Sequence, residues 1–373
     1  MKNNWQTKKL SEICDIKTGK KDVNQGNPNG QYPFFTCARE HTYSDEYSFD
    51  MEALLVAGNG DVGHVSYYNG KFETYQRTYI LHNFKDLILT RFLHLFLDGY
   101  LKATVSKQKL GNTMPYIKMG ILTDFKIPVP PLPEQKRIVK ILDEAFEKIE
   151  KAKENAEKNL KNSKELFESY LQSVFANPGK DWEEKTLGEV CEIVSVLIDP
   201  KKKDFYDMYH IGAGNMISNS EVLVDLKTAK EEKLISGKFL FDTSTVLYSK
   251  IRPYLMKVVR PDFNGLCSAD IYPLKPKDKI IIRNFLFYIL LSKKFTEYAI
   301  KGSARAGMPK VNREHLFAYN FSLPKVIEQK SIVKKLDLLL EQTKKLEGVY
   351  KQKLADLEEL KRSVLKKAFA GKL

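Results

Sequence analysis

The sequence predicts an α+β protein in which one unit, a mixed lobe followed by a long helix, occurs twice. Three observations support this fold class: a recurring opening segment, a recurring segment at the end of each lobe, and two long stretches with helical spacing. The opening "WQTKKLSEICDI" at Trp5 recurs as "WEEKTLGEVCEI" at Trp182, and "EQKRIVKILD" at Glu134 recurs as "EQKSIVKKLD" at Glu328. The first shift is 177 residues and the second is 194, so the second copy carries additional residues in its middle.

The repeat divides the chain into two lobes and two helices. We expect a first lobe over residues 1–132, a first long helix over 133–176, a second lobe over 177–326, and a second long helix with a C-terminal tail over 327–373. Prolines stand just before both helices, where they mark a helix start, and none interrupts residues 134–176.

The lobes are expected to contain much β-strand. "LLVAG", "HVSYYNGKF" and "TYILHNF" alternate apolar and polar residues, and the Asn69–Gly70 pair between them predicts a hairpin turn. Short helices are expected over 90–101 and 283–300, where apolar residues recur at helical spacing.

Both long helices show coiled-coil spacing, with apolar residues recurring in alternating steps of three and four. The predicted seam residues are Ile138, Leu142 and Ile149 in the first helix and Ile332, Leu336, Leu339, Leu346 and Leu357 in the second. At about 1.5 Å per residue, helices of this length extend for roughly 65 Å. We expect them to pack against each other.

Composition places the chain among globular proteins that stay in the cytoplasm. It has 373 residues, of which 43% are hydrophobic, enough for two or three compact units. No run approaches the 18 apolar residues of a membrane helix, and the N-terminus lacks an apolar signal core. The cysteines Cys14, Cys37, Cys191 and Cys267 form no Cys-x-x-Cys pair, so neither a disulfide nor a zinc site is expected.

Charge indicates a polyanionic partner. The net charge is +14, and the second lobe holds the largest share, with 24 basic and 18 acidic residues. An excess of lysine and arginine on globular lobes suits nucleic acid, although many basic proteins bind none.

One stretch has the glycine spacing of a dinucleotide-binding loop. Residues 54–68, "LLVAGNGDVGHVSYY", contain Gly58, Gly60 and Gly63 in the spacing G-x-G-x-x-G after an apolar run. A dinucleotide site needs a helix after these glycines, whereas β-branched and aromatic residues follow here. The repeat also aligns Gly58 with Lys250 and Gly60 with Arg252. The sequence therefore argues against a bound cofactor.

Other catalytic patterns are also missing from the sequence. It contains no phosphate-binding G-x-x-x-x-G-K-[ST], no H-E-x-x-H and no G-x-S-x-G, and its six histidines do not cluster. Glu183 and Lys185 resemble part of a nuclease site, but the matching stretch "NNWQTKK" of the first copy has no carboxylate. We therefore expect no catalytic residue, no metal site and no cofactor site on this chain.

The duplicated motifs resemble those of the DNA-specificity subunits of Type I restriction–modification systems. The resemblance covers essentially the whole chain. Four marks carry it: the two openings, "NTMPYIKMGILTDFKIPVPPLPEQKRIVKILD" with its copy "AGMPKVNREHLFAYNFSLPKVIEQKSIVKKLD", the two long helices, and the ending "LKRSVLKKAFAGKL". The second copy departs slightly, because "LPKVIEQ" replaces "PPLPEQ" at the helix start.

This resemblance implies two target-recognition domains separated by an antiparallel helical pair with pseudo-two-fold symmetry. Each domain would read one half of a split, asymmetric target in double-stranded DNA, and the helices would fix the gap. The implied partners are two methyltransferase subunits, which bring S-adenosylmethionine, and restriction subunits, which use ATP and Mg²⁺. Two alternatives remain open: a coiled-coil adaptor that binds proteins, and a restriction enzyme that acts alone.

The candidate DNA contacts are polar and basic residues in matched loops of the two lobes. Arginine suits guanine, asparagine and glutamine suit adenine, and lysine suits phosphates. In the first lobe they are Asn59, Asp61, His64, Gln76, Arg77, Lys107, Gln108, Lys109 and Asn112. In the second they are Lys250, Arg252, Tyr254, Lys257, Lys301, Ser303, Arg305 and Lys310. Arg77 and Arg252 rank first, because each is expected in or beside an apolar strand, where an unpaired arginine is costly.

Overall fold

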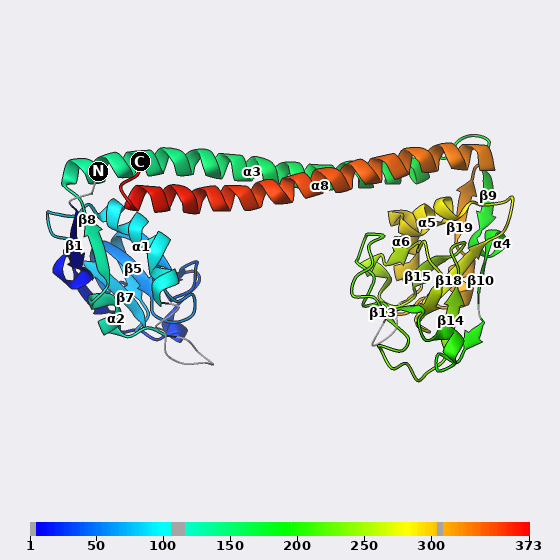
Figure 1. Cartoon of the computed structure of the whole chain (residues 1–373), viewed down its shortest axis with the longest axis horizontal. Helices are drawn as coiled ribbons and strands as arrows, with labels where there is room; N and C mark the ends of the chain where they lie inside the picture. The colour runs from blue at the N-terminus through cyan, green and yellow to red at the C-terminus, as the bar shows by residue number, and fades with distance from the viewer. Residues whose placement is uncertain (1–4, 106–115, 195, 304–308) are drawn as a thin grey trace. The chain divides into compact units, whose positions relative to one another are not determined.

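The computed structural model describes residues 5–105, 116–194, 196–303 and 309–373. The chain forms two compact units: unit 1 comprises Met1–Glu157 with Gln352–Leu373, and unit 2 comprises Lys158–Lys351. Two long helices, α3 (Leu132–Ala176) and α8 (Val326–Phe369), contribute to both units (Figure 1). Each unit therefore combines one lobe with part of each helix. No helix in the described ranges is long and apolar enough to span a membrane.

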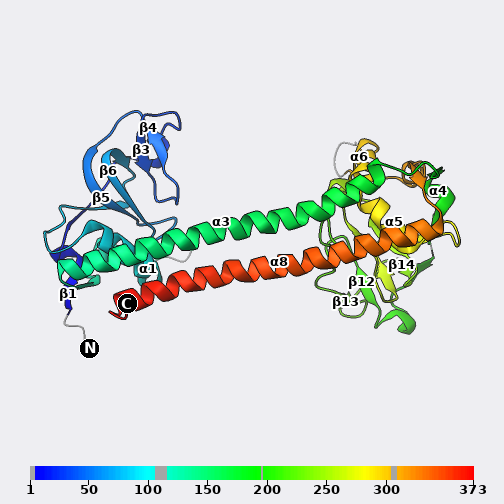
Figure 2. The same ribbon diagram turned by 90° about the horizontal axis from the view of Figure 1, so that it is seen from above.

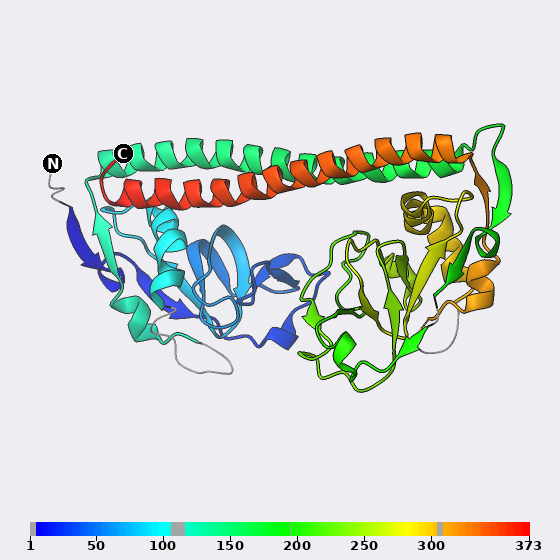
Figure 3. The same ribbon diagram turned by 45° about the vertical axis from the view of Figure 1, so that its right-hand side comes forward.

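The lobe of unit 1 is built on a six-stranded sheet with the order β2-β7-β5-β6-β3-β4. Its strands are β2 (Asp15–Thr18), β3 (Tyr32–Phe35), β4 (Thr42–Ser44), β5 (Phe49–Ala57), β6 (Val65–Thr74) and β7 (Thr78–His82). Helix α1 (Thr90–Val105) packs on the sheet through buried phenylalanines and leucines (Figure 3). The short helix α2 (Met119–Thr123) and the strand pair β1 (Gln6–Lys9) and β8 (Lys126–Val129) complete the lobe.

The predicted hairpin turn at Asn69–Gly70 is wrong. Both residues lie inside the continuous strand β6, where Asn69 pairs with Glu52 and Gly70 with Met51 of β5. Because β5 is nine residues long, its antiparallel partner continues straight through the Asn-Gly pair. The turn that joins the antiparallel strands β5 and β6 lies earlier in the chain, over residues 58–64.

The lobe of unit 2 contains two larger sheets and the strand pair β9-β19. The first has the order β10-β18-β15-β16, and the second has the order β11-β14-β17-β12-β13. The strands are β9 (Glu183–Thr186), β10 (Cys191–Ile193), β11 (Leu197–Ile198), β12 (Tyr209–Ile211), β13 (Lys227–Thr228), β14 (Lys238–Phe241), β15 (Val246–Ser249), β16 (Val258–Val259), β17 (Gly265–Cys267), β18 (Ile271–Pro276) and β19 (Asn320–Leu323). The helices are α4 (Leu187–Val190), α5 (Arg283–Leu291), α6 (Lys293–Lys301) and α7 (Arg313–Phe317). The helix expected over 283–300 is thus two helices, because Ser292 is extended and caps α6.

The sequence repeat is a structural repeat. Strands β2-β7-β5-β6 of unit 1 correspond in order to β10-β18-β15-β16 of unit 2, and β1-β8 corresponds to β9-β19. The register agrees as well, since Leu54 pairs with Leu81 and Val246 pairs with Leu274. These residues are 192 and 193 positions apart between the copies, within the range that the sequence shifts predict.

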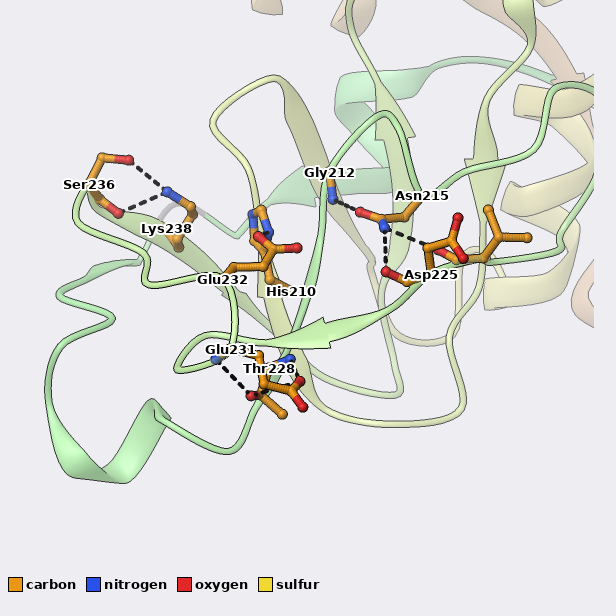
Figure 4. A network of polar contacts seen from close by, with 10 residues as sticks. His210, Gly212, Asn215, Asp225, Thr228, Glu231, Glu232, Ser236 and Lys238 are labelled. Atoms are coloured by element: carbon orange, nitrogen blue, oxygen red, sulfur yellow. Dashed lines mark hydrogen bonds and ion pairs between the residues drawn. The ribbon is translucent and has the colours of Figure 1, made fainter.

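The lobes differ in what surrounds this shared sheet. Unit 1 extends it with β3 and β4, whereas unit 2 adds its separate five-stranded sheet. Side chains fix the loops of that second sheet (Figure 4). Asn215 receives the Gly212 N–H at 2.8 Å, and His210 Nδ1 lies 2.7 Å from Glu232. The second sheet accounts for the additional residues in the middle of the second copy.

Each lobe buries the start of one long helix and the end of the other. In unit 1 the start of α3 (Ile138, Leu142) and Phe369 near the end of α8 share the lobe's core. In unit 2 the core contains Leu336 of α8 and Phe175 of α3. Phe369 lies 5.3 Å from Phe92 between ring centroids, and Phe175 lies 5.7 Å from Phe285 in the equivalent pair.

Within unit 1 the two helices run antiparallel (Figure 2). Lys153 of α3 pairs with Glu358 of α8 at 3.3 Å, and Lys361 of α8 lies over the Phe146 ring of α3. The predicted seam has three degrees of burial. Ile138, Leu142, Ile149 and Leu336 are buried, Ile332, Leu339 and Leu357 are partly buried, and Leu346 is 41% exposed.

A buried glutamine fastens the start of α3 to its lobe. Gln135 is fully buried in the first turn of the helix. Its Oε1 accepts the Leu89 N–H at 2.8 Å, and its Nε2 donates to the carbonyls of Leu87 and Pro130 at 2.9 and 2.8 Å. One side chain thus ties the helix start to the loop that precedes α1.

The same clamp occurs in unit 2. Gln329 is fully buried, and its Oε1 accepts the Ile282 N–H at 2.9 Å. Its Nε2 donates to the carbonyls of Ile280 and Pro324, both at 2.8 Å. Glutamine is required because it supplies one acceptor and two donor hydrogens from one amide.

Replacing either clamp glutamine with leucine should destabilise the protein. Gln329→Leu removes the partners of the Ile282 N–H and of the Ile280 and Pro324 carbonyls, of which Pro324 is buried. An unsatisfied buried group costs about 1–3 kcal/mol, so we expect the free energy of unfolding to fall by about that amount, measured by urea denaturation followed by circular dichroism. Gln352→Leu is the matched control, because Gln352 is exposed on α8 and its amide donates to Asp356 of the same helix. Equal stability of the two variants would contradict the clamp.

Candidate nucleic-acid interface

The two lobes hold equivalent loops with equivalent backbone bonds. After β5, the Gly58 N–H donates to the Arg77 carbonyl at 3.0 Å, and the Gly58 carbonyl accepts the Ile117 N–H at 2.9 Å. After β15, the Lys250 N–H donates to the Asp270 carbonyl at 2.9 Å, and its carbonyl accepts the Val311 N–H at 2.8 Å. The predicted alignment of Gly58 with Lys250 is therefore confirmed.

A buried tyrosine supports this loop in each lobe. The Tyr79 hydroxyl donates to the Ile117 carbonyl at 2.7 Å, and the Tyr272 hydroxyl donates to the Val311 carbonyl at 3.2 Å. Burial raises the pKa of both phenols, so they stay protonated donors at neutral pH. The framework of each loop thus consists of matched backbone bonds and one matched tyrosine.

The glycine-rich stretch is a tight connection between two strands. It joins β5 to β6, and no helix follows it, as the sequence predicts. Gly60 and Gly63 have φ values of +59° and +82°, which side chains disfavour. A Cβ at Gly58 would lie 2.3 Å from the Arg77 carbonyl oxygen. These glycines therefore serve the tight turn and the close approach of the backbone at Arg77.

The three candidate DNA contacts on the β5–β6 loop, Asn59, Asp61 and His64, differ in their exposure and in their partners. Asn59 is partly exposed. Asp61 forms an ion pair with Lys102 of α1, and this hydrogen bond holds the pKa of the Asp61 carboxyl below its usual range. His64 lies beside Ser66, with Nε2 and the hydroxyl oxygen 3.3 Å apart. Asp61 is therefore paired with a cation within its own lobe.

Gln76 and Arg77 lie on the exposed turn between β6 and β7. Arg77 directly precedes β7 and so lies beside a strand as predicted, but it is exposed, and leaving its guanidinium unpaired therefore carries no burial cost. Among the described residues its guanidinium has no hydrogen-bond or ion-pair partner, whereas the Gln76 amide contacts Asp22 at 3.4 Å. Arg77 borders a surface pocket of about 550 Å³ whose lining includes Tyr79 and Tyr116.

In unit 2, Arg252 is exposed at the turn after Lys250. Its φ of +50° is in the left-handed region, and Tyr254 is also exposed beside it. The Arg252 guanidinium has no partner among the residues that the structure describes. Arg252 is thus also on a turn and not in a strand.

Three further candidates of this loop region are engaged within the lobe. Lys257 donates to the Ala213 carbonyl at 2.5 Å. Lys310 pairs with Asp270 at 3.1 Å, and both side chains are about half exposed. Lys250 stacks its ammonium over the Tyr272 ring at 5.0 Å from the centroid.

The remaining candidates separate into three groups. Lys301 is exposed at the end of α6. Ser303 is 2% exposed and its hydroxyl donates to the Ile300 carbonyl, so this surface does not present it to DNA. Lys107, Gln108, Lys109, Asn112 and Arg305 lie outside the described residues.

Two charged residues at this site, Asp270 and Arg313, were not among the candidates predicted from the sequence. Asp270 lies beside Lys310 and Lys250, and Arg313 is close enough to contribute to lowering the pKa of Lys250. The repeat contained the signal, because Asp270 occupies the position of Arg77 and Arg313 that of Met119. An alignment of the copies through the whole lobe would have found both.

Nothing in the described ranges forms a group of three or more histidine, cysteine or acidic residues that could hold a metal. Glu183 and Lys185, which resemble part of a nuclease site, pair with each other at 3.3 Å on β9. The four cysteines are buried and free. Cys14 and Cys191 donate weakly to the Leu10 and Leu187 carbonyls, which explains the matching cysteines in the two openings.

Comparison with known proteins agrees with this duplicated architecture. The family model described as "Type I restriction modification DNA specificity domain" matches twice, over residues 2–159 and 179–357. The EcoDI specificity subunit of Escherichia coli is 32% identical over 402 aligned positions, covering 99% of this chain and 88% of that protein. The MjaVIII specificity subunit of Methanocaldococcus jannaschii is 25% identical, covering 75% and 70% of the two chains.

Solved structures share the fold. One, from work on complex assembly and conformational transition of the type I R-M system, superposes with a TM-score of 0.74 at 18% identity, covering 99% of this chain and 98% of that chain. The HsdS subunit of Thermoanaerobacter tengcongensis gives a TM-score of 0.58 at 18% identity and covers 99% and 97% of the two chains. With two copies of the specificity domain on one duplicated framework, this chain belongs to the family of Type I restriction–modification DNA-specificity subunits.

Proposed function

We propose that each lobe of this specificity subunit reads one half of a bipartite, asymmetric DNA target. One observation carries the proposal: the two lobes share backbone bonds at the loop after the central strand, yet present different side chains there. A matched framework supports equivalent docking on DNA. Different donors and acceptors are what reading two different half-sites requires.

The long helices are proposed to set the distance between the half-sites. Helices α3 and α8 contain 45 and 44 residues. At about 1.5 Å per residue each extends for roughly 65 Å, which exceeds the ~34 Å between half-sites one helical turn apart. We further propose that the recognition domains and the spacer helices meet at residues 132, 176 and 326, as the sequence predicts.

The chain is further proposed to dock two methyltransferase subunits and, in a restriction complex, the restriction subunits. The cofactors S-adenosylmethionine, ATP and Mg²⁺ then belong to these partners. Family membership disfavours both alternatives, the protein-binding adaptor and the restriction enzyme that acts alone. Methylation assays with this chain alone and with a methyltransferase partner test the alternative of a restriction enzyme that acts alone. Only such an enzyme would be active without the partner.

Arg77→Ala and Arg252→Ala should each relax recognition of one half-site. Losing a base contact costs about 1–3 kcal/mol and changes the preference at one position only. Binding to duplexes altered in either half-site, measured at fixed salt, checks this. Arg362→Ala on α8 is the matched control and should leave both half-sites unaffected. If a variant loses affinity equally for unrelated DNA sequences, the replaced arginine contacts a phosphate and not a base.

Leu338→Glu together with Val349→Glu should weaken assembly with the methyltransferase subunits. These side chains are 54% and 59% exposed on α8, and their spacing of 11 residues places them on one helix face. Exposed apolar residues on one face suit a protein partner. We expect reduced co-purification with an unchanged circular dichroism spectrum, because neither side chain belongs to the lobe core. Full assembly of the double variant would contradict docking at this face.

A further inference from the structure

The equivalent loops of the two lobes carry opposite charge at one matched position. The framework bonds place Arg77 of unit 1 and Asp270 of unit 2 at the same point, because each carbonyl accepts the N–H of the residue after the central strand. A guanidinium only donates hydrogen bonds, whereas a carboxylate only accepts them. The two lobes therefore present complementary chemistry from one scaffold.

The space beside this position is open in unit 1. The pocket of about 550 Å³ is bordered by Gly58, Arg77, Tyr79 and Tyr116. In unit 2 the equivalent residues are Lys250, Asp270, Tyr272 and Lys310. The Lys250 ammonium lies over the Tyr272 ring, whereas Gly58 has no side chain to cover the ring of Tyr79. Unit 2 therefore offers charged groups where unit 1 offers a pocket.

Asp270 lies beside Lys310 and near Lys250, and Arg313 is a further cation near Lys250. Lys310 contacts its Oδ1 at 3.1 Å, and in the described part of the chain the other oxygen has no hydrogen-bond partner. Burial lowers the pKa of Lys250, and the neighbouring Lys310 and Arg313 lower it further while Asp270 opposes them. Phosphate binding alone would be served better without a carboxylate, since Asp270 repels the DNA backbone.

We propose that Asp270 determines the base specificity of the second lobe. Its carboxylate accepts a hydrogen bond from the exocyclic amino group of cytosine or adenine, which are the donors in the major groove. Lys310 orients the carboxylate, and Lys250 and Arg313 attract the adjacent phosphates. Arg77 at the matched position of the first lobe suits guanine. This inference rests on the proposed function, because it names the base class that one lobe reads.

Selection from a random duplex library tests the inference. The probe is the full chain assembled with its methyltransferase subunits, in wild-type form and as Asp270→Ala, Asp270→Asn and Lys310→Gln. We expect the wild type to select cytosine or adenine at one position of one half-site. Asp270→Ala should lose that preference by about tenfold, and Asp270→Asn should shift it toward adenine, which an amide matches through N6 and N7.

Lys310→Gln distinguishes reading from positioning. If Asp270 only holds Lys310 on a phosphate, both the Asp270→Ala and Lys310→Gln variants weaken binding to every sequence alike and leave the selected bases unchanged, which overturns the inference. If Asp270→Ala selects the same motif as the wild type, the inference is wrong but the proposed function is unaffected. Absence of any bipartite motif with the wild type overturns the proposed function itself.

Discussion

The structure depends on one buried amide in each lobe. Gln135 and Gln329 bind three backbone groups each and fix where α3 and α8 leave their lobes. An error in direction at the start of a long helix displaces its far end by a larger distance, so the proposed role of α3 and α8 as spacers requires a rigid start. Three bonds from one buried side chain supply this rigidity, because breaking any of them leaves an unsatisfied group away from water.

A second contact holds each helix against its lobe, and here the copies differ. Asp143 of α3 and Asp337 of α8 occupy the same place in the repeat. Asp143 pairs with Arg91 at 2.6 Å, whereas Asp337 pairs at 2.8 Å with Arg260, which also binds Glu221. Arg260 is largely buried over the Phe287 ring, so its pairs are screened less by solvent than the exposed pair of unit 1. The same helix position is thus fastened from two different elements.

The loop after the central strand has the same backbone hydrogen bonds in both lobes but different side chains. Backbone bonds and a buried tyrosine fix the loop after the central strand, and backbone bonds do not depend on side-chain identity. Side chains that project from this loop are therefore free to differ between the lobes. Arg77 and Arg252 are exposed on turns with no partner among the described residues, as a group that binds another molecule needs to be.

The sequence by itself determined the duplication, the strand-rich lobes, the long helices and the strand that follows the glycine motif in place of a helix, because these follow from local patterns and from the repeat. It misplaced the Asn69–Gly70 turn, since a long partner strand overrides local turn preference, and it expected Ser303 on the surface. Only the tertiary structure decided that Gln135 and Gln329 are clamps, and that Asp270 pairs with Lys310. These roles depend on contacts between residues tens of positions apart, such as Gln135 with Leu89 and Asp270 with Lys310, which no local pattern encodes.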